Sequence, residues 1–204
     1  MLEEECAMDK KKVISIITRN YIMILKRAKR KIDFSTIKKL YINSFPTNER
    51  APFYMLKKKA IAHKADMWCI YDKNLFVGMA YVVSNKDLAY LFYFAIDESL
   101  RGKHYGTRAL KSVFRLYEDK KIFLALEDWK EKAENADERI KRHNFYLKAG
   151  LKDLPYYLKE VNMIYALMGN CNIVHPNEYK TLINNYLGFP KKYFLDMRII
   201  INKL

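Results

Sequence analysis

The stretch FYFAIDESLRGKHYGTRAL, residues 92–110, is the most informative part of the sequence. Its first five residues complete an apolar run that begins at Leu88, which is typical of a strand buried on both faces. A basic loop with two glycines follows, and from Tyr105 onward the apolar residues recur at helical spacing. The sequence therefore predicts a buried strand, a glycine-containing loop and a long helix (residues 105–118) in direct succession.

The loop between this strand and this helix has the features of an anion-binding site. The first N–H groups of a helix have no partner within it, and the helix dipole favours negative charge there. Gly102 and Gly106 let the backbone approach phosphate oxygens, and Arg101 and Lys103 add positive charge. The nucleotide-binding pattern G-x-x-x-x-G-K-[ST] occurs nowhere in the chain. We therefore expect this loop to hold a pyrophosphate in another way.

Outward from this segment, the hydrophobic pattern predicts one α+β domain around a single sheet, without the regular βαβα alternation of a dinucleotide fold. Asp33 is the expected N-cap of the first helix, and Phe53, Leu56, Ala60 and Ile61 form the expected buried face of the second. The predicted strands are 23–28, 67–71, 75–84, 88–96 and 122–126, with two more within 151–168. The predicted helices are 34–45, 52–64, 105–118, 137–149 and 178–187.

Three regions are expected along the chain. Residues 1–22 are interpreted as a disordered N-terminal extension, with Met23 as an alternative start. Residues 23–168 form the predicted core, and residues 169–204 a C-terminal tail of helix and strand packed on it. The apolar run at 13–25 is too short to span a bilayer and contains Arg19 and Asn20, so no membrane segment is expected.

Composition narrows the class of partner. The formal net charge of +15 predicts an anionic partner, although dispersed, solvated lysines are an alternative explanation. The run KRAKRK at 26–31 is compatible with a nucleic-acid-binding module, but no helix-turn-helix, zinc-finger or aromatic RNA-binding motif accompanies it. The three cysteines are far apart and the four histidines lack ligand spacing. We therefore expect no metal, no disulfide, and a cytoplasmic protein with reduced thiols.

The loop residues Arg101 to Thr107 resemble the pyrophosphate loop of the GNAT N-acetyltransferases, Arg/Gln-x-x-Gly-x-Gly/Ala. FYLKAGL at 145–151 and NSFPTNERAPF at 43–53 are similar to further segments of that family. The resemblance covers roughly residues 23–168. It implies one GNAT-like domain, with a central, mostly antiparallel mixed sheet flanked by helices and splayed central strands.

One position departs from the family pattern. His104 stands where the family usually has its first glycine. If that position needs a positive φ, we expect strain on the order of 1 kcal/mol and weaker cofactor binding.

The resemblance implies transfer of the acetyl group of acetyl-CoA to a primary amine, by direct attack through a tetrahedral intermediate. The acceptor is a small molecule or a peptide, and homodimers are common in the family. Tyr146 is the candidate general acid and Glu127 the candidate general base, directly or through water. The predicted cofactor-binding residues are Phe94, Ala95 and Ile96 of the strand, and Arg101, Gly102, Lys103, His104, Tyr105, Gly106 and Thr107 of the loop.

Purely structural roles for these residues stay open as alternatives. Tyr146 is equally consistent with core packing, and Glu127 with a solvated carboxylate at a strand end. Tyr81, Tyr90, Phe92 and Tyr93 would line an acceptor cleft or simply fill the core. We expect His143 to be a surface residue. A further alternative for the whole chain is the same fold acting as a catalytically weak cofactor-binding or interaction domain.

Overall fold

The computed structural model describes residues 23–160, 163–188 and 197–200, so the predicted extension at 1–22 lies outside the described residues. The described part folds around one eight-stranded sheet in the order β1-β2-β3-β4-β5-β7-β6-β8. Only the β4–β5 pair is parallel, and all other neighbours in this sheet are antiparallel. The predicted α+β class and the mixed, mostly antiparallel sheet are confirmed.

The predicted strands and helices within residues 23–187 are present, with ends that differ by three residues or fewer. The strands are β1 (Ile24–Arg27), β2 (Asp66–Asp72), β3 (Leu75–Ser84), β4 (Leu88–Ile96), β5 (Lys121–Leu126), β6 (Lys152–Glu160), β7 (Met163–Gly169) and β8 (Met197–Ile200). The α-helices are α2 (Lys31–Ser44), α3 (Phe53–Ile61), α4 (Tyr105–Leu116), α5 (Ala136–Lys148) and α6 (Pro176–Leu187). Short 3-10 turns η1 (Thr47–Glu49) and η2 (Glu98–Leu100) follow α2 and β4.

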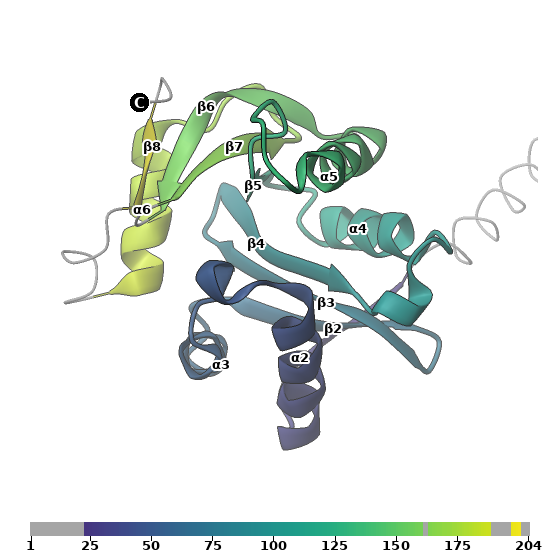
Figure 1. Ribbon diagram of the computed structural model, residues 1–204. Helices are drawn as coiled ribbons and strands as arrows, with labels where there is room; N and C mark the ends of the chain where they lie inside the picture. Colours follow the sequence, from purple (N-terminus) through teal and green to yellow (C-terminus); the bar gives the residue numbers. More distant parts are fainter. Residues whose placement is uncertain (1–22, 161–162, 189–196, 201–204) are drawn as a thin grey trace, which may run out of the picture.

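The helices cover both faces of the sheet, as Figure 1 shows for α2 and α3 against α4. Buried side chains of α2, α3 and α6 form one core cluster with one face of β3 and β4. Buried side chains of α4 and α5 form a second cluster with the opposite face. Alternation along β3 divides the strand between them, since Tyr81 belongs to the first cluster and Ala80 to the second.

Two local expectations are wrong. Asp33 does not cap α2 but lies in its first turn, where its carboxylate accepts hydrogen bonds from the backbone N–H groups of Arg30 (2.9 Å) and Lys29 (3.2 Å). The helix therefore begins earlier, at Lys31. A carboxylate in the first turn can accept hydrogen bonds from the N–H groups of residues that precede the helix. Ile61 is 59% exposed at the end of α3, where Leu56 is the buried residue.

Candidate active site

A cleft opens where the neighbouring strands β4 and β5 separate. Their pairing joins only Leu88–Tyr90 to Lys121–Phe123, although β4 continues to Ile96 and β5 to Leu126. Beyond this point the backbone N–H and C=O groups of one strand that face the gap form no hydrogen bond with the other strand. Because buried peptide groups need a hydrogen-bond partner, these groups are suited to bind a ligand. The gap leads into a cleft of about 1140 Å³. The predicted splay of the central strands is confirmed.

The cleft is lined from both faces of the sheet. We call one side the loop half; it is formed by Arg101, Gly102, His104, Gly106, Thr107, Phe145 and Tyr146. We call the side formed by Glu49, Tyr90, Tyr93, Glu160 and Tyr165 the hairpin half, because the last two belong to the β6–β7 hairpin.

Most of the predicted site residues come together in this cleft. Those that line it are Phe94, Ala95, Ile96, Arg101, Gly102, His104, Gly106, Thr107, Glu127 and Tyr146. Lys103 and Tyr105 belong to the same loop but are not part of the lining. Of the aromatic residues considered for an acceptor cleft, Tyr90, Phe92 and Tyr93 line it, whereas Tyr81 is fully buried in the core.

The loop holds a defined conformation ahead of α4. Asp97 accepts hydrogen bonds from the backbone N–H (3.0 Å) and the hydroxyl (2.6 Å) of Ser99, and thereby closes the turn after β4. Gly102 (φ 75°) and His104 (φ 60°, ψ 6°) both adopt positive φ, and His104 is the residue that precedes the helix. The condition for strain at His104 is therefore met. The first-turn N–H groups of α4 have no partner within the helix and lie at the cleft.

A close contact joins the loop to the FYLKAGL segment. A Cβ atom placed on Gly106 would lie 3.3 Å from the ring of Phe145 on α5 and 3.7 Å from Ile96 on β4. The Phe145 ring in turn stacks against Phe94, with 6.5 Å between the ring centroids. Glycine at this position lets α4 approach both α5 and β4. The two segments that resemble the family are thus neighbours in space.

Tyr146 lies next to this contact and is 9% exposed. Burial raises the pKa of its phenol to about 12, although the nearby Arg142 lowers it slightly. Its hydroxyl has no hydrogen-bond partner among the described residues. The group is therefore protonated at neutral pH and free to donate a hydrogen bond into the cleft.

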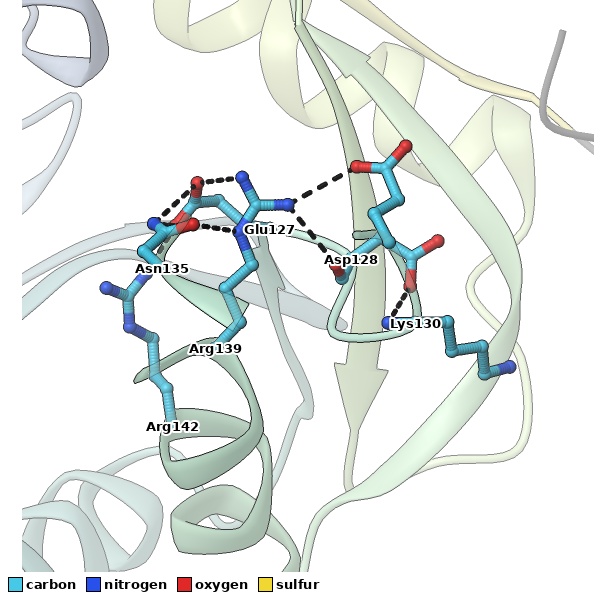
Figure 2. A network of polar contacts seen from close by, with 7 residues as sticks. Glu127, Asp128, Lys130, Asn135, Arg139 and Arg142 are labelled. Carbon is cyan, nitrogen blue, oxygen red and sulfur yellow. Dashed lines mark hydrogen bonds and ion pairs between the residues drawn. The ribbon is translucent and has the colours of Figure 1, made fainter. Parts of the chain in front are cut away.

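The carboxylate of Glu127, directly after β5, forms ion pairs and a hydrogen bond with three residues. Figure 2 shows its carboxylate between Arg139 and Arg142 of α5 and the amide of Asn135. The oxygen–nitrogen distances are 2.7 Å to Arg139, 3.3 Å to Arg142 and 3.3 Å to Asn135. Only 10% of the Glu127 side chain is exposed. These contacts connect the first half of α5 to the end of β5.

The prediction that His143 is a surface residue is wrong. It is 7% exposed, its Nε2 lies 2.8 Å from a carboxylate oxygen of Asp153, and its ring stacks on Trp129 with 3.6 Å between centroids. The helical pattern could not reveal this position because the covering groups come from β6 and from the loop after β5.

The hairpin half contains polar groups that the sequence did not single out. Glu160 lines the cleft at the end of β6, and one of its oxygens accepts hydrogen bonds from the hydroxyls of Tyr90 (2.8 Å) and Tyr179 (3.2 Å). Glu49 is half-buried, and burial, followed by the charge of Glu127, raises its pKa. Glu49 lies within the NSFPTNERAPF segment that resembles the family, but nothing in that resemblance singled it out. Glu160 lies in no motif, and both glutamates reach the cleft through the packing of distant elements.

Two features are missing from the part of the chain that the structure describes. No group of three or more histidine, cysteine, aspartate or glutamate side chains there is arranged to hold a metal ion. No helix in the same residues has both the length and the apolar character that crossing a bilayer requires.

Comparisons with known proteins agree with this geometry. Residues 34–150, more than half of the chain, match the model of the "Acetyltransferase (GNAT) family". No curated protein matches the sequence.

Several solved structures have the same fold. A putative GNAT acetyltransferase from Bacteroides thetaiotaomicron is 21% identical, with a TM-score of 0.65, over 78% of this chain and 92% of that one. An aminoglycoside 6'-N-acetyltransferase complexed with coenzyme A is 14% identical, with a TM-score of 0.56, over 76% and 99%. The ribosomal-protein-S18-alanine N-acetyltransferase from Escherichia coli is 12% identical, with a TM-score of 0.54, over 72% and 92%.

Proposed function

This chain belongs to the GNAT acetyltransferase family, and we propose that it is an enzyme that transfers the acetyl group of acetyl-CoA to a primary amine. The observation that carries the proposal is the cleft between β4 and β5, with the basic, glycine-containing loop at the start of α4 on one side. A cosubstrate that lies in the loop half would present its thioester to an amine that enters from the hairpin half. The solved aminoglycoside acetyltransferase of the same fold is in complex with coenzyme A.

The loop half fits a pyrophosphate. The N–H groups of Tyr105, Gly106 and Thr107 belong to the first turn of α4, where no helical carbonyl can accept from them. Gly102 is exposed, and a Cβ placed on it meets no atom within 4 Å, so the backbone there is accessible. Arg101 and Lys103 are exposed cations on the same loop. Arg101, Gly102, Lys103, His104, Tyr105, Gly106 and Thr107 would together hold the diphosphate.

The free edge of β4 supports the next part of the cosubstrate. Phe94, Ala95 and Ile96 lie on the segment of β4 that has separated from β5 and line the cleft. Their backbone groups are suited to hydrogen-bond an extended amide-bearing arm, as an added strand would be. A strand N–H directed at the thioester carbonyl would also stabilise the oxyanion that forms during attack.

Two side chains complete the proposed chemistry. The Tyr146 phenol, protonated at neutral pH, would donate a proton to the leaving thiolate. Glu127, the base expected from the sequence, remains a prediction, and its contacts with Arg139 and Arg142 favour a role in holding α5 against β5.

Binding is tested first, by a thermal-shift titration with acetyl-CoA. A ligand that binds only the folded state at about 100 times its dissociation constant adds roughly 2.7 kcal/mol of stability. Arg101→Ala is expected to weaken the shift. The matched control is Lys111→Ala, which removes an exposed cation from α4 outside the cleft lining. No stabilisation of the wild-type protein would refute the proposal.

Transfer is tested by thiol release from acetyl-CoA in the presence of a panel of amines, with acetylated products identified by mass spectrometry. Release that depends on the amine supports an enzyme. Stabilisation by acetyl-CoA without any amine-dependent release would support the alternative, a binding or interaction domain of the same fold.

A further inference from the structure

Glu160 is a carboxylate in the cleft for which the mechanism above has no role. The hydroxyls of Tyr90 and Tyr179 both donate hydrogen bonds to the same oxygen of Glu160, Oε1. The other oxygen, Oε2, has no hydrogen-bond partner among the described residues. Glu160 is partly exposed and lines the cleft, so one oxygen is held in place and the other is available to a ligand.

Several phenols surround Glu160. Tyr90 of β4 and Tyr179 of α6 donate hydrogen bonds to it. Burial raises the pKa of Tyr93 on β4, Tyr165 on β7 and Tyr186 on α6, and the negative charge of Glu160 also raises it. Among the described residues Glu160 forms no ion pair. Burial raises its pKa to about 7, against the opposing effect of the hydrogen bonds from Tyr90 and Tyr179. A general base is most effective when its pKa lies near the working pH.

A second carboxylate lies in the same half of the cleft. Glu49 is half-buried and makes no ion pair with any described residue. The hydroxyl of Tyr93 donates a hydrogen bond to the Glu49 backbone carbonyl at 3.0 Å, which holds this segment against β4. The hairpin half therefore presents two carboxylates that form no ion pair with any described residue, although the charges of Arg142 and Arg139 oppose the rise that burial causes in the pKa of Glu49. Carboxylates at such a site attract cations and repel anions.

Resting on the proposed acetyl transfer, we propose that Glu160 binds the acceptor's ammonium group through Oε2 and takes its proton, and that the acceptor is an amine without a neighbouring carboxylate. The ammonium passes one proton to Glu160, and the neutral nitrogen forms a bond to the thioester carbon. When the tetrahedral intermediate collapses, the carbon–sulfur bond breaks and the thiolate takes a proton from Tyr146. The intermediate's nitrogen loses its second proton, which restores the phenol, and Glu160 releases its proton to solvent.

The decisive variant is Glu160→Gln, whose amide oxygen can still accept from Tyr90 and Tyr179. Acetylation of 1,5-diaminopentane and tyramine is expected to lose about 10²–10⁴-fold in kcat/KM, the usual contribution of a general base. The wild-type kcat/KM is expected to rise with pH around pH 7, as Glu160 loses its proton. This rise is expected to be absent in Glu160→Gln. Alanine, whose carboxylate adjoins its amine, is a poor acceptor for the wild-type protein.

Two controls separate a catalytic role from a structural one. Glu118→Gln removes a carboxylate from an exposed position outside the cleft lining and leaves the pH profile unchanged. Tyr179→Phe removes one donor that lowers the pKa of Glu160, so the rise in kcat/KM moves to higher pH. Loss of packing alone would lower the rate without moving that midpoint.

Stability measurements provide a readout that needs no activity. Since the folded protein holds the Glu160 proton more tightly than the unfolded chain, folding takes up a proton between about pH 4.5 and 7. Wild-type stability therefore falls across this range relative to Glu160→Gln. A constant difference between the two proteins would contradict the inference.

The two proposals fail in different ways. If acetyl-CoA does not stabilise the wild-type protein and no amine is acetylated, the proposed function is refuted, and the inference with it. If the wild-type protein acetylates amines and Glu160→Gln keeps its kcat/KM and pH profile, only the role of Glu160 is refuted.

Discussion

Replacement of His104 by glycine tests whether the loop at the cleft carries backbone strain. His104 adopts φ 60° and ψ 6°, and its exposed side chain makes no hydrogen bond that caps α4. The left-handed conformation costs an L-residue roughly 1–2 kcal/mol. Glycine removes that cost but loses about 0.5–1 kcal/mol more backbone entropy on folding. The expected net gain in the free energy of unfolding is therefore about 0.5–1 kcal/mol, or roughly 1–4 °C in Tm for a chain of this size.

The assay is chemical denaturation of the wild-type protein, His104→Gly and the control His104→Ala. Alanine carries the same Cβ atom into the left-handed region, so His104→Ala is expected to differ from the wild type by less than about 0.5 kcal/mol. Equal stability of the glycine and alanine variants would refute the strain argument.

Cofactor affinity provides a second measurement on the same variant. If the loop keeps this conformation when acetyl-CoA binds, the cost of the positive φ at His104 falls on folding and cancels on binding. The acetyl-CoA dissociation constant of His104→Gly is expected to change by less than about threefold, which is below 1 kcal/mol. A tenfold tighter complex with unchanged stability would show instead that the strain opposes binding.

Three further substitutions test other parts of the cleft. Tyr146→Phe is expected to reduce turnover by about 10²-fold or more, with acetyl-CoA affinity nearly unchanged in a thermal-shift titration; equal turnover would exclude the proton-donor role. Gly106→Ala forces a Cβ to within 3.3 Å of Phe145 and is expected to cost about 1–3 kcal/mol and to weaken acetyl-CoA binding. Its control Gly102→Ala, at φ 75° with no neighbour within 4 Å, strains the backbone without displacing Phe145. Glu127→Gln is expected to lower the free energy of unfolding by about 1–3 kcal/mol, measured by denaturation, because Arg139 and Arg142 lose their carboxylate; a loss of turnover at unchanged stability would instead support the base role.

The order of strand, loop and helix around residues 92–110 could be predicted from the sequence because each part depends on local properties. A continuous apolar run predicts a buried strand, and glycines with basic residues before a helical pattern predict an anion site. The ends of elements depend on more than local spacing, as the first turn of α2 shows. There, Asp33 serves N–H groups that precede the helix, so α2 begins before the residue that resembled its cap.

The meeting of residues from distant segments could not be predicted, because nothing in local spacing reports it. Gly106 must lack a side chain only because α5 brings Phe145 against it. His143 is buried only because Trp129 and Asp153 cover it from outside its helix.

The class of fold, the loop at the start of α4 and the resemblance to the GNAT family therefore follow from local properties of the sequence. The chemistry of the hairpin half depends instead on tertiary packing. Burial among distant elements raises the pKa of Glu160 to about 7, against the opposing hydrogen bonds from Tyr90 on β4 and Tyr179 on α6. Burial and hydrogen bonding between segments 19 and 70 residues apart are properties of packing, which no local pattern encodes.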